Sequence, residues 1–597
     1  MTLWAPGSLN PEQEAAISAP GNIILIACPG SGKTRTLTYK VASEVEKITS
    51  QREYVCAITY THRAADEIDA RIVELGVDTE QLWIGTIHAF CLEWIIRPYG
   101  IYHPKLQSGF QVINSHETEQ MISPLCSGRS PRITNFDCGF HFTSTGLVLE
   151  SRDARKWAGV NDILDDYFAQ LEDSRMLDFE HILLYALELI QLRPEISKIL
   201  SKVFTYIAVD EYQDTREIQY EIIATILRAG AGRVRTMIVG DPNQAIFSSL
   251  GGYAVDPTDY SSRTGLTLDT MELSKNYRSS TRIIDYFSHY KVAGSPIVPS
   301  SRQSLYASQI TFDNALDRSD LESEIVRLIR HNVDDLGISP DEICVVAPWW
   351  VHLASLTRSL VAALPEFEFD GPGLMPFARD HDNFWYKLAR IGLTEASPRM
   401  FVSRLRWARD ILNELNAASV STGEATPRSL LRLSNGIHLI ETDGLAYLGE
   451  YFDEVFRLLN IDFTAVSTLV GQREAFFREA QTRVDRLVRE GTPFATNIDV
   501  FRKVFRPRAG ITVSTIHGVK GAEFDTMIAF ALMDGMVPHF SDADQLDSAK
   551  RLLYVIGSRA RKNLHLIAER GRPRGGSFPD YDTSIALRDL SFAYDVY

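Results

Sequence analysis

Long apolar segments are missing from this sequence of 597 residues. It has no uninterrupted apolar run of the roughly 18 residues that a membrane-spanning helix needs, so we expect no transmembrane segment. Residues 1–6 lack the basic and apolar regions of a signal peptide, which favours a cytoplasmic protein. The six cysteines include no CxxC pair, so we expect reduced thiols and no disulfide framework.

Positive charge is also scarce. The sequence has 61 Lys and Arg against 77 Asp and Glu, which gives a net charge of −16. This balance argues against a protein that coats nucleic acid with a basic surface, but it does not exclude a local groove, because phosphate contacts depend on local charge. The length predicts roughly three or four domains.

Short apolar runs rich in β-branched residues alternate with helical patterns. The first group of runs lies at 23–27, 54–59, 83–86, 206–209 and 236–240. The second group lies at 309–312, 343–347, 511–515, 526–531 and 564–568. Strands that alternate with helices predict an α/β protein with two parallel sheets.

Two segments interrupt this alternation, at 92–195 and 376–507. Both carry few buried-strand patterns, and the second is rich in helical periodicity. Strands resume after each segment, which favours helical insertions into the α/β parts. Independent helical domains are the alternative.

The most informative motif is ACPGSGKT at 27–34, between an apolar run and a helical pattern. Backbone N–H groups around Gly30 and Gly32 can surround a phosphate because no Cβ blocks the approach. Lys33 would reach the β- and γ-phosphates, and the Thr34 hydroxyl would bind Mg²⁺. Ala27 stands where such loops usually begin with Gly. The predicted ATP contacts from this segment are Ala27, Cys28, Pro29, Gly30, Ser31, Gly32, Lys33, Thr34 and Arg35.

A second motif, DEYQD at 210–214, follows the apolar run at 206–209. In a P-loop protein such a strand is expected to lie beside the P-loop strand. Asp210 would then hold Mg²⁺, and Glu211 would orient and deprotonate the attacking water. The two motifs together predict ATP hydrolysis.

The order of motifs along the chain resembles the superfamily 1A helicases of the UvrD/Rep/PcrA-like group. The matching segments are LNPEQ at 9–13, AITYTHRAA at 57–65, GTIHAF at 85–90, LDF at 177–179, DEYQD at 210–214, GDPNQ at 240–244, NYRS at 276–279, TIHGVKGAEF at 515–524 and RLLYVIGSRA at 551–560. They span nearly the whole chain in family order.

This resemblance implies further nucleotide contacts. Gln13 would recognise the adenine base, Tyr277 would stack on this base and Glu523 would form a hydrogen bond with the ribose. Gln244 would sense the γ-phosphate. Arg278 and Arg559 would act as arginine fingers, which supply about 10³–10⁵ in rate in related NTPases.

The resemblance also implies two RecA-like domains, each with a largely helical insertion. The first domain (1A) would comprise 1–91 and 196–274, with insertion 1B at 92–195. The second (2A) would comprise 275–375 and 508–597, with a shortened insertion 2B at 376–507. ATP would bind between 1A and 2A.

The implied DNA contacts are Tyr60, Thr86, His88, Phe247 and His517. Base–aromatic stacking suits such a site because it tolerates any sequence. Two departures stand out. Ser249-Leu250 replaces the usual Trp-Arg pair, and Ala347-Pro348-Trp349 lies where the family commonly has Arg. We therefore expect a weaker grip on DNA, or a grip through other aromatic residues.

These observations predict an ATP- and Mg²⁺-dependent translocase on single-stranded or partly duplex DNA, with 3′–5′ polarity implied only by the resemblance. The short 2B and the stretch 83–98 resemble the helicase-like subunit of the Gabija anti-phage system, whose partner is an ATPase–TOPRIM nuclease. The alternatives are a free-standing repair helicase and an ATPase subunit that senses DNA ends or nucleotide with little unwinding.

Overall fold

The computed structural model describes residues 3–596 except 152, 248–250, 295, 373, 375, 378–379, 381–382, 419, 490–492, 507–509, 541, 543 and 575–577. The chain divides into two compact units. Unit 1 comprises Met1–Ala315 and Leu532–Tyr597, and unit 2 comprises Leu316–Ala531. None of the helices in the described part is both long and apolar enough to cross a membrane.

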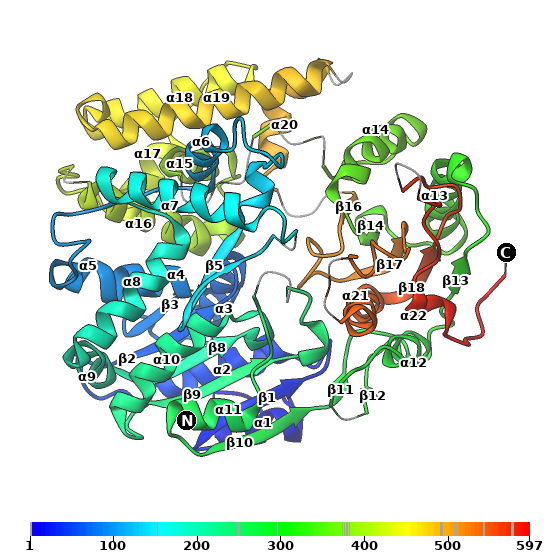
Figure 1. Ribbon diagram of the computed structural model, residues 1–597, viewed down its shortest axis with the longest axis horizontal. Coiled ribbons are helices and arrows are strands. Elements are labelled where there is room, and N and C mark those ends of the chain that lie inside the picture. The colour runs from blue at the N-terminus through cyan, green and yellow to red at the C-terminus, as the bar shows by residue number, and fades with distance from the viewer. Residues whose placement is uncertain are drawn as a thin grey trace. The chain divides into compact units, whose positions relative to one another are not determined.

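Unit 1 is built on a parallel sheet with the strand order β10-β1-β9-β8-β2-β3 (Figure 1). The strands are β1 (Asn22–Ala27), β2 (Tyr54–Thr59), β3 (Leu82–Thr86), β8 (Phe204–Asp210), β9 (Arg235–Gly240) and β10 (Leu268–Leu273). All five strands predicted for this group are confirmed. The sequence pattern does not predict β10, because this strand lies at the sheet edge and most of its residues are at least partly exposed.

Helices cover both faces of this sheet, which explains why its strands read as continuous apolar runs. One face, with Ile23 and Leu25, packs on α2 (Lys33–Val45) and α3 (His62–Glu74). The other face, with Ile24, shares a core with α8 (Phe179–Leu192) and α10 (Glu217–Gly230). The alternation of side chains along β1 places neighbouring residues in two different cores.

The segment from 92 to 195 is largely helical but also contains a hairpin. Its main helices are α6 (Ser115–Leu125), α7 (Trp157–Ser174) and α8. Strands β5 (Phe140–Thr143) and β6 (Gly146–Leu149) pair antiparallel. The sequence analysis did not find this hairpin, because each strand has only four residues and β6 is exposed over most of its length.

The remainder of unit 1 comes from distant parts of the chain. β13 (Ile310–Asp313) pairs in parallel with β18 (Ala560–Ile567), and α12 (Thr281–Ser288) packs on α21 (Gln545–Arg559). An aromatic contact joins α12 to α21, because the rings of Phe287 and Tyr554 pack with 5.2 Å between their centroids. The strands predicted at 309–312 and 564–568 are confirmed with small shifts in their ends.

Unit 2 contains parallel strands in the order β17-β14-β16-β15. These are β14 (Ile343–Ala347), β15 (Phe369–Asp370), β16 (Ile511–Thr515) and β17 (Phe524–Ala529). The predicted α/β class with parallel sheets is therefore confirmed, and among these four strands of unit 2 only the two-residue β15 was not predicted. The described part of 376–507 is helical, with α15 (Phe384–Leu393), α16 (Phe401–Ala417), α17 (Pro427–Asn435), α18 (Gly444–Leu459), α19 (Ser467–Arg489) and α20 (Ile498–Lys503).

The helices of unit 2 enclose an aromatic core around Trp385. Its indole is fully buried and lies 5.0 Å from the Phe452 ring and 5.2 Å from the Phe456 ring, between centroids. The indole N–H donates to the Leu469 carbonyl at 2.8 Å. The helical part thus buries the apolar surface of this side chain and also provides a hydrogen-bond acceptor for its N–H group.

We predict that Trp385→Ala lowers the free energy of unfolding of this helical part by about 3–5 kcal/mol, because it leaves a cavity and an unpaired carbonyl. Urea unfolding followed by hydrogen exchange in residues 384–503 measures the change. Phe401→Ala is the control, since Phe401 is 47% exposed and its loss should cost less than about 0.5 kcal/mol. Equal effects of the two substitutions would contradict the assigned core.

Candidate active site

The P-loop runs from the end of β1 at Ala27 to the start of α2 at Lys33. Gly30 and Gly32 adopt left-handed backbone angles, with φ of +66° and +80°. A Cβ on Gly30 would lie 2.5 Å from the Arg278 Cβ, and one on Gly32 would lie 2.6 Å from the Gln13 amide nitrogen. Glycine is therefore required here for the backbone conformation and for close packing against two other motifs.

The departure at Ala27 has a structural explanation. Ala27 is the last residue of β1 and pairs with Leu273 of β10, so its backbone is extended and accepts a Cβ. The following Cys28 donates its N–H to the Leu273 carbonyl at 3.0 Å. Burial, with the nearby Asp241 carboxylate, raises the pKa of the Cys28 thiol to about 12. This thiol is therefore neutral and unreactive at physiological pH.

Residues around α1 (Pro11–Ser18) and Tyr277 hold the P-loop from one side. The Gln13 amide donates to the Ser31 carbonyl at 2.9 Å. Asn10 caps α1 and donates from its side chain to the Tyr277 hydroxyl at 2.9 Å. Tyr277 also donates its backbone N–H to the Gly30 carbonyl at 2.9 Å, and its side chain is 44% exposed. The two residues predicted to meet adenine thus lie beside the same loop.

The acidic residues at the end of β8 lie against the P-loop lysine. Lys33 Nζ is 2.5 Å from Glu211 Oε1. Burial lowers the pKa of Lys33, but the charges of Glu211 and Asp210 outweigh it and the pKa is raised. Burial and the Glu211 charge raise the pKa of Asp210 to about 7, against the opposing effect of Lys33. Glu211 also has a left-handed φ of +52°, a strained conformation of the kind found at functional sites.

A chain of side-chain contacts continues from Glu211 to Arg559. Gln213 donates to Glu211 Oε2 at 2.5 Å and accepts the backbone N–H of Asp241 at 3.0 Å. Asp241 Oδ2 accepts the Gln244 amide at 2.9 Å, and the Gln244 carbonyl accepts an N–H of Arg559. Tyr554 donates to the same Asp241 oxygen at 3.2 Å. The sequence analysis missed the roles of Gln213, Asp241 and Tyr554, although all three lie within the quoted motifs.

The two predicted arginine fingers meet at the end of α21. Arg559 is the last residue of α21 and only 2% exposed, so burial, together with the charge of Arg278, lowers its pKa to about 10. Arg278 donates to the Ser558 carbonyl at 2.9 Å. The Arg559 guanidinium therefore remains charged at neutral pH although it is buried.

The site contains oxygen atoms suited to a nucleotide and Mg²⁺. The Ser31 hydroxyl is buried and has no hydrogen-bond partner in the described part of the chain. No group of three or more His, Cys, Asp or Glu could hold a metal among the described residues. Mg²⁺ usually takes one or two carboxylates and completes its shell with phosphates and water. Asp210 and Thr34 fit this pattern.

The predicted DNA contacts of unit 1 fall into two groups. The rings of Tyr60 and Phe247 pack together with 5.4 Å between centroids, and Tyr60 remains 44% exposed. Thr86 caps the short helix α4 (Ile87–Phe90), and His88 meets Phe179 edge-on with 5.6 Å between centroids. Ser249 and Leu250 lie outside the described residues. His517 and Glu523 belong to unit 2, where both lie between β16 and β17.

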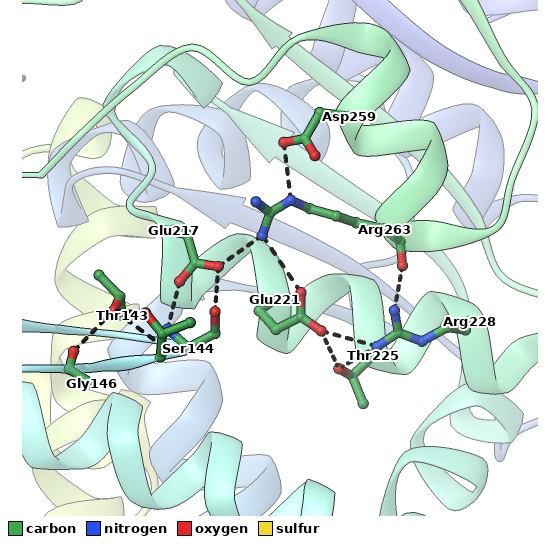
Figure 2. Close-up of polar contacts among 10 residues, drawn as sticks. Thr143, Ser144, Gly146, Glu217, Glu221, Thr225, Arg228, Asp259 and Arg263 are labelled. Atoms are coloured by element: carbon green, nitrogen blue, oxygen red, sulfur yellow. Dashed lines mark hydrogen bonds and ion pairs between the residues drawn. The ribbon is translucent and has the colours of Figure 1, made fainter.

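A polar network that the sequence analysis did not find joins the β5–β6 hairpin to α10, the helix after the acidic motif. Figure 2 shows Ser144 at the hairpin tip, which donates its N–H and its hydroxyl to Glu217 at 2.6 and 2.7 Å. Arg263 donates to the same carboxylate at 2.8 Å and to Asp259 at 3.0 Å. The hairpin is thereby fixed to the segment that carries Asp210 and Glu211.

We predict that Gly32→Ala abolishes measurable ATP binding, because the new Cβ displaces Gln13 and distorts the loop. Gly76→Ala is a matched control. Gly76 has a similar φ of +74° but open space around the Cβ position, so both variants should lose about 1 kcal/mol of stability from backbone strain. Calorimetric titration with ATP and thermal unfolding measure the two effects. Equal ATP affinity in both variants would refute the steric argument.

Comparison with known proteins agrees with this geometry. The family described as UvrD/REP helicase N-terminal domain matches residues 9–254, and the UvrD-like helicase C-terminal domain matches 502–571. The ATP-dependent DNA helicase PcrA of Leuconostoc citreum is 23% identical over 94% of this chain and 81% of its own length. The ATP-dependent DNA helicase UvrD1 of Mycobacterium tuberculosis is 24% identical over 94% of this chain and 82% of its own length. The ATP-dependent DNA helicase srs2 of Schizosaccharomyces pombe is 25% identical over 98% of this chain and 74% of its own length. The chain therefore belongs to the UvrD/PcrA-like family of superfamily 1A helicases and is an enzyme of that class.

Proposed function

We propose that this chain is an ATP-driven motor that moves along single-stranded DNA in the 3′–5′ direction and separates duplex ahead of it. The observation that carries the proposal is the continuous set of contacts from Lys33 through Glu211, Gln213, Asp241 and Gln244 to Arg559. These contacts hold a phosphate-binding lysine, two carboxylates and a buried guanidinium in one site.

Each group has a role in hydrolysis. Mg²⁺, held by Thr34 and Asp210, would neutralise the β- and γ-phosphates. Glu211 orients the attacking water and takes its proton, while Arg278 and Arg559 counter the charge that develops on the γ-phosphate. Gln13 and Tyr277 bind the adenine, and Glu523 bonds the ribose. The two arginines act only when the γ-phosphate is present, so hydrolysis changes the contacts that they make.

The link to DNA runs through Gln244. Phe247 follows Gln244 by three residues and packs on Tyr60. Gln244 bonds both Asp241 and Arg559, so a change at the γ-phosphate shifts the backbone that carries Phe247. Bases stacked on the Tyr60–Phe247 pair would then be gripped or released as the nucleotide changes.

The domain organisation that we propose is that of two motor domains with helical insertions, bounded as the sequence predicts. For the biological role we propose a cytoplasmic anti-phage complex with an ATPase–TOPRIM nuclease. The compact helical insertion at 376–507 supports a chain that depends on a partner. Recovery of such a nuclease with the tagged chain from its own cells would support this role, whereas recovery of the chain alone would favour a repair helicase.

We predict that Glu211→Gln binds ATP with near wild-type affinity but hydrolyses it about 10²–10⁴-fold more slowly, because the general base is lost. ATP affinity and steady-state turnover with single-stranded DNA measure the two effects. Glu74→Gln removes a carboxylate from the exposed end of α3 and should leave both unchanged. Turnover by Glu211→Gln at the wild-type rate would mean that another group activates the water.

A further inference from the structure

The chain exposes an aromatic surface directly after β14 in unit 2. Trp350 is 60% exposed and Val351 is 72% exposed. The preceding Trp349 lies on the ring of His352 in a stacked arrangement, with 5.8 Å between centroids and an interplanar angle of 24°. A large indole face in water is costly unless something covers it. This segment therefore has the character of a binding surface.

The sheet places this surface beside the predicted DNA contact of unit 2. β14 pairs in parallel with β16, with Ala347 opposite Thr515. The Ile516 N–H donates to the Ala347 carbonyl at 3.0 Å, so both strands end at the same edge of the sheet. The loop after β16 exposes His517, and the one after β14 exposes Trp350. Ligands of open parallel sheets bind at the carboxyl ends of the strands.

We propose that Trp350, supported by the Trp349–His352 stack, is a base-stacking surface for single-stranded DNA. A flat indole suits a nucleobase, because stacking on an aromatic ring tolerates every base. In the neighbouring loop the Thr515 hydroxyl accepts the Gly518 N–H at 3.0 Å, and the same loop carries the exposed His517. The proposal rests on the proposed function, in that the strand must pass this edge of the sheet.

An aromatic stack predicts a specific pattern of DNA affinities. Base stacking needs the bases, whereas phosphate contacts do not. Trp350→Ala should weaken binding of a fluorescent oligothymidylate about 5- to 150-fold. The same variant should bind an abasic oligonucleotide of equal length as the wild type does. Trp350→Phe, which keeps an aromatic face, should recover most of the lost affinity.

Fluorescence anisotropy titrations of the full chain test this pattern, with Phe401→Ala as the control for loss of an exposed aromatic ring in unit 2. Thermal unfolding establishes that each variant is folded. Unchanged affinity of Trp350→Ala for oligothymidylate would overturn the proposal, as would an equal loss on both oligonucleotides. An unchanged DNA affinity with weaker binding of a protein partner would assign the surface to that partner instead. If the wild type bound neither oligonucleotide, the proposed function itself would fail.

Discussion

The ion pair between Lys33 and Glu211 joins the start of α2 to the end of β8 in unit 1, and much of the site follows from it. A buried ammonium group is stable only when carboxylates offset the loss of water. Glu211 and Asp210 supply this charge from the end of β8, and the charge of the lysine in turn lowers the pKa of Asp210 against the opposing effect of burial. The pair therefore fixes the position of the P-loop relative to the end of β8. β9 separates β8 from β1, whereas the sequence predicts that these two strands lie side by side.

The same constraint extends to Arg559. Its guanidinium is buried at the end of α21, and the polar groups of Gln244 and Asp241 compensate for the missing water. Gln213 connects Asp241 to Glu211, so the lysine and the arginine share one hydrogen-bonded network. Removing one member leaves another buried charge poorly compensated, which explains why residues from four motifs occur together. The hairpin contact at Glu217 further restrains the helix that follows the acidic motif.

Much of this arrangement could be predicted from the sequence. The strands β2, β14 and β16 were predicted to the residue, because buried parallel strands read as apolar runs. The edge strand β10 and the hairpin β5–β6 could not be predicted in this way, because their exposed residues interrupt the apolar pattern. Spacing alone cannot bring Lys33 together with Arg559, so their shared site depended on the family resemblance. The hydrogen bonds of Gln213 and Asp241 depend on side-chain geometry that no sequence motif specifies. The departure from the family pattern at Ser249-Leu250 lies outside the described residues.

Arg559 belongs to the hydrogen-bonded network that includes the P-loop lysine, and we propose that it acts on the γ-phosphate. The most direct measurement is the ATP turnover of Arg559→Ala with saturating single-stranded DNA, beside Arg588→Ala, which removes a surface arginine paired with Asp582. Turnover of Arg559→Ala should fall about 10³-fold or more, whereas Arg588→Ala should retain wild-type turnover. Wild-type turnover of Arg559→Ala would mean that this guanidinium takes no part in hydrolysis.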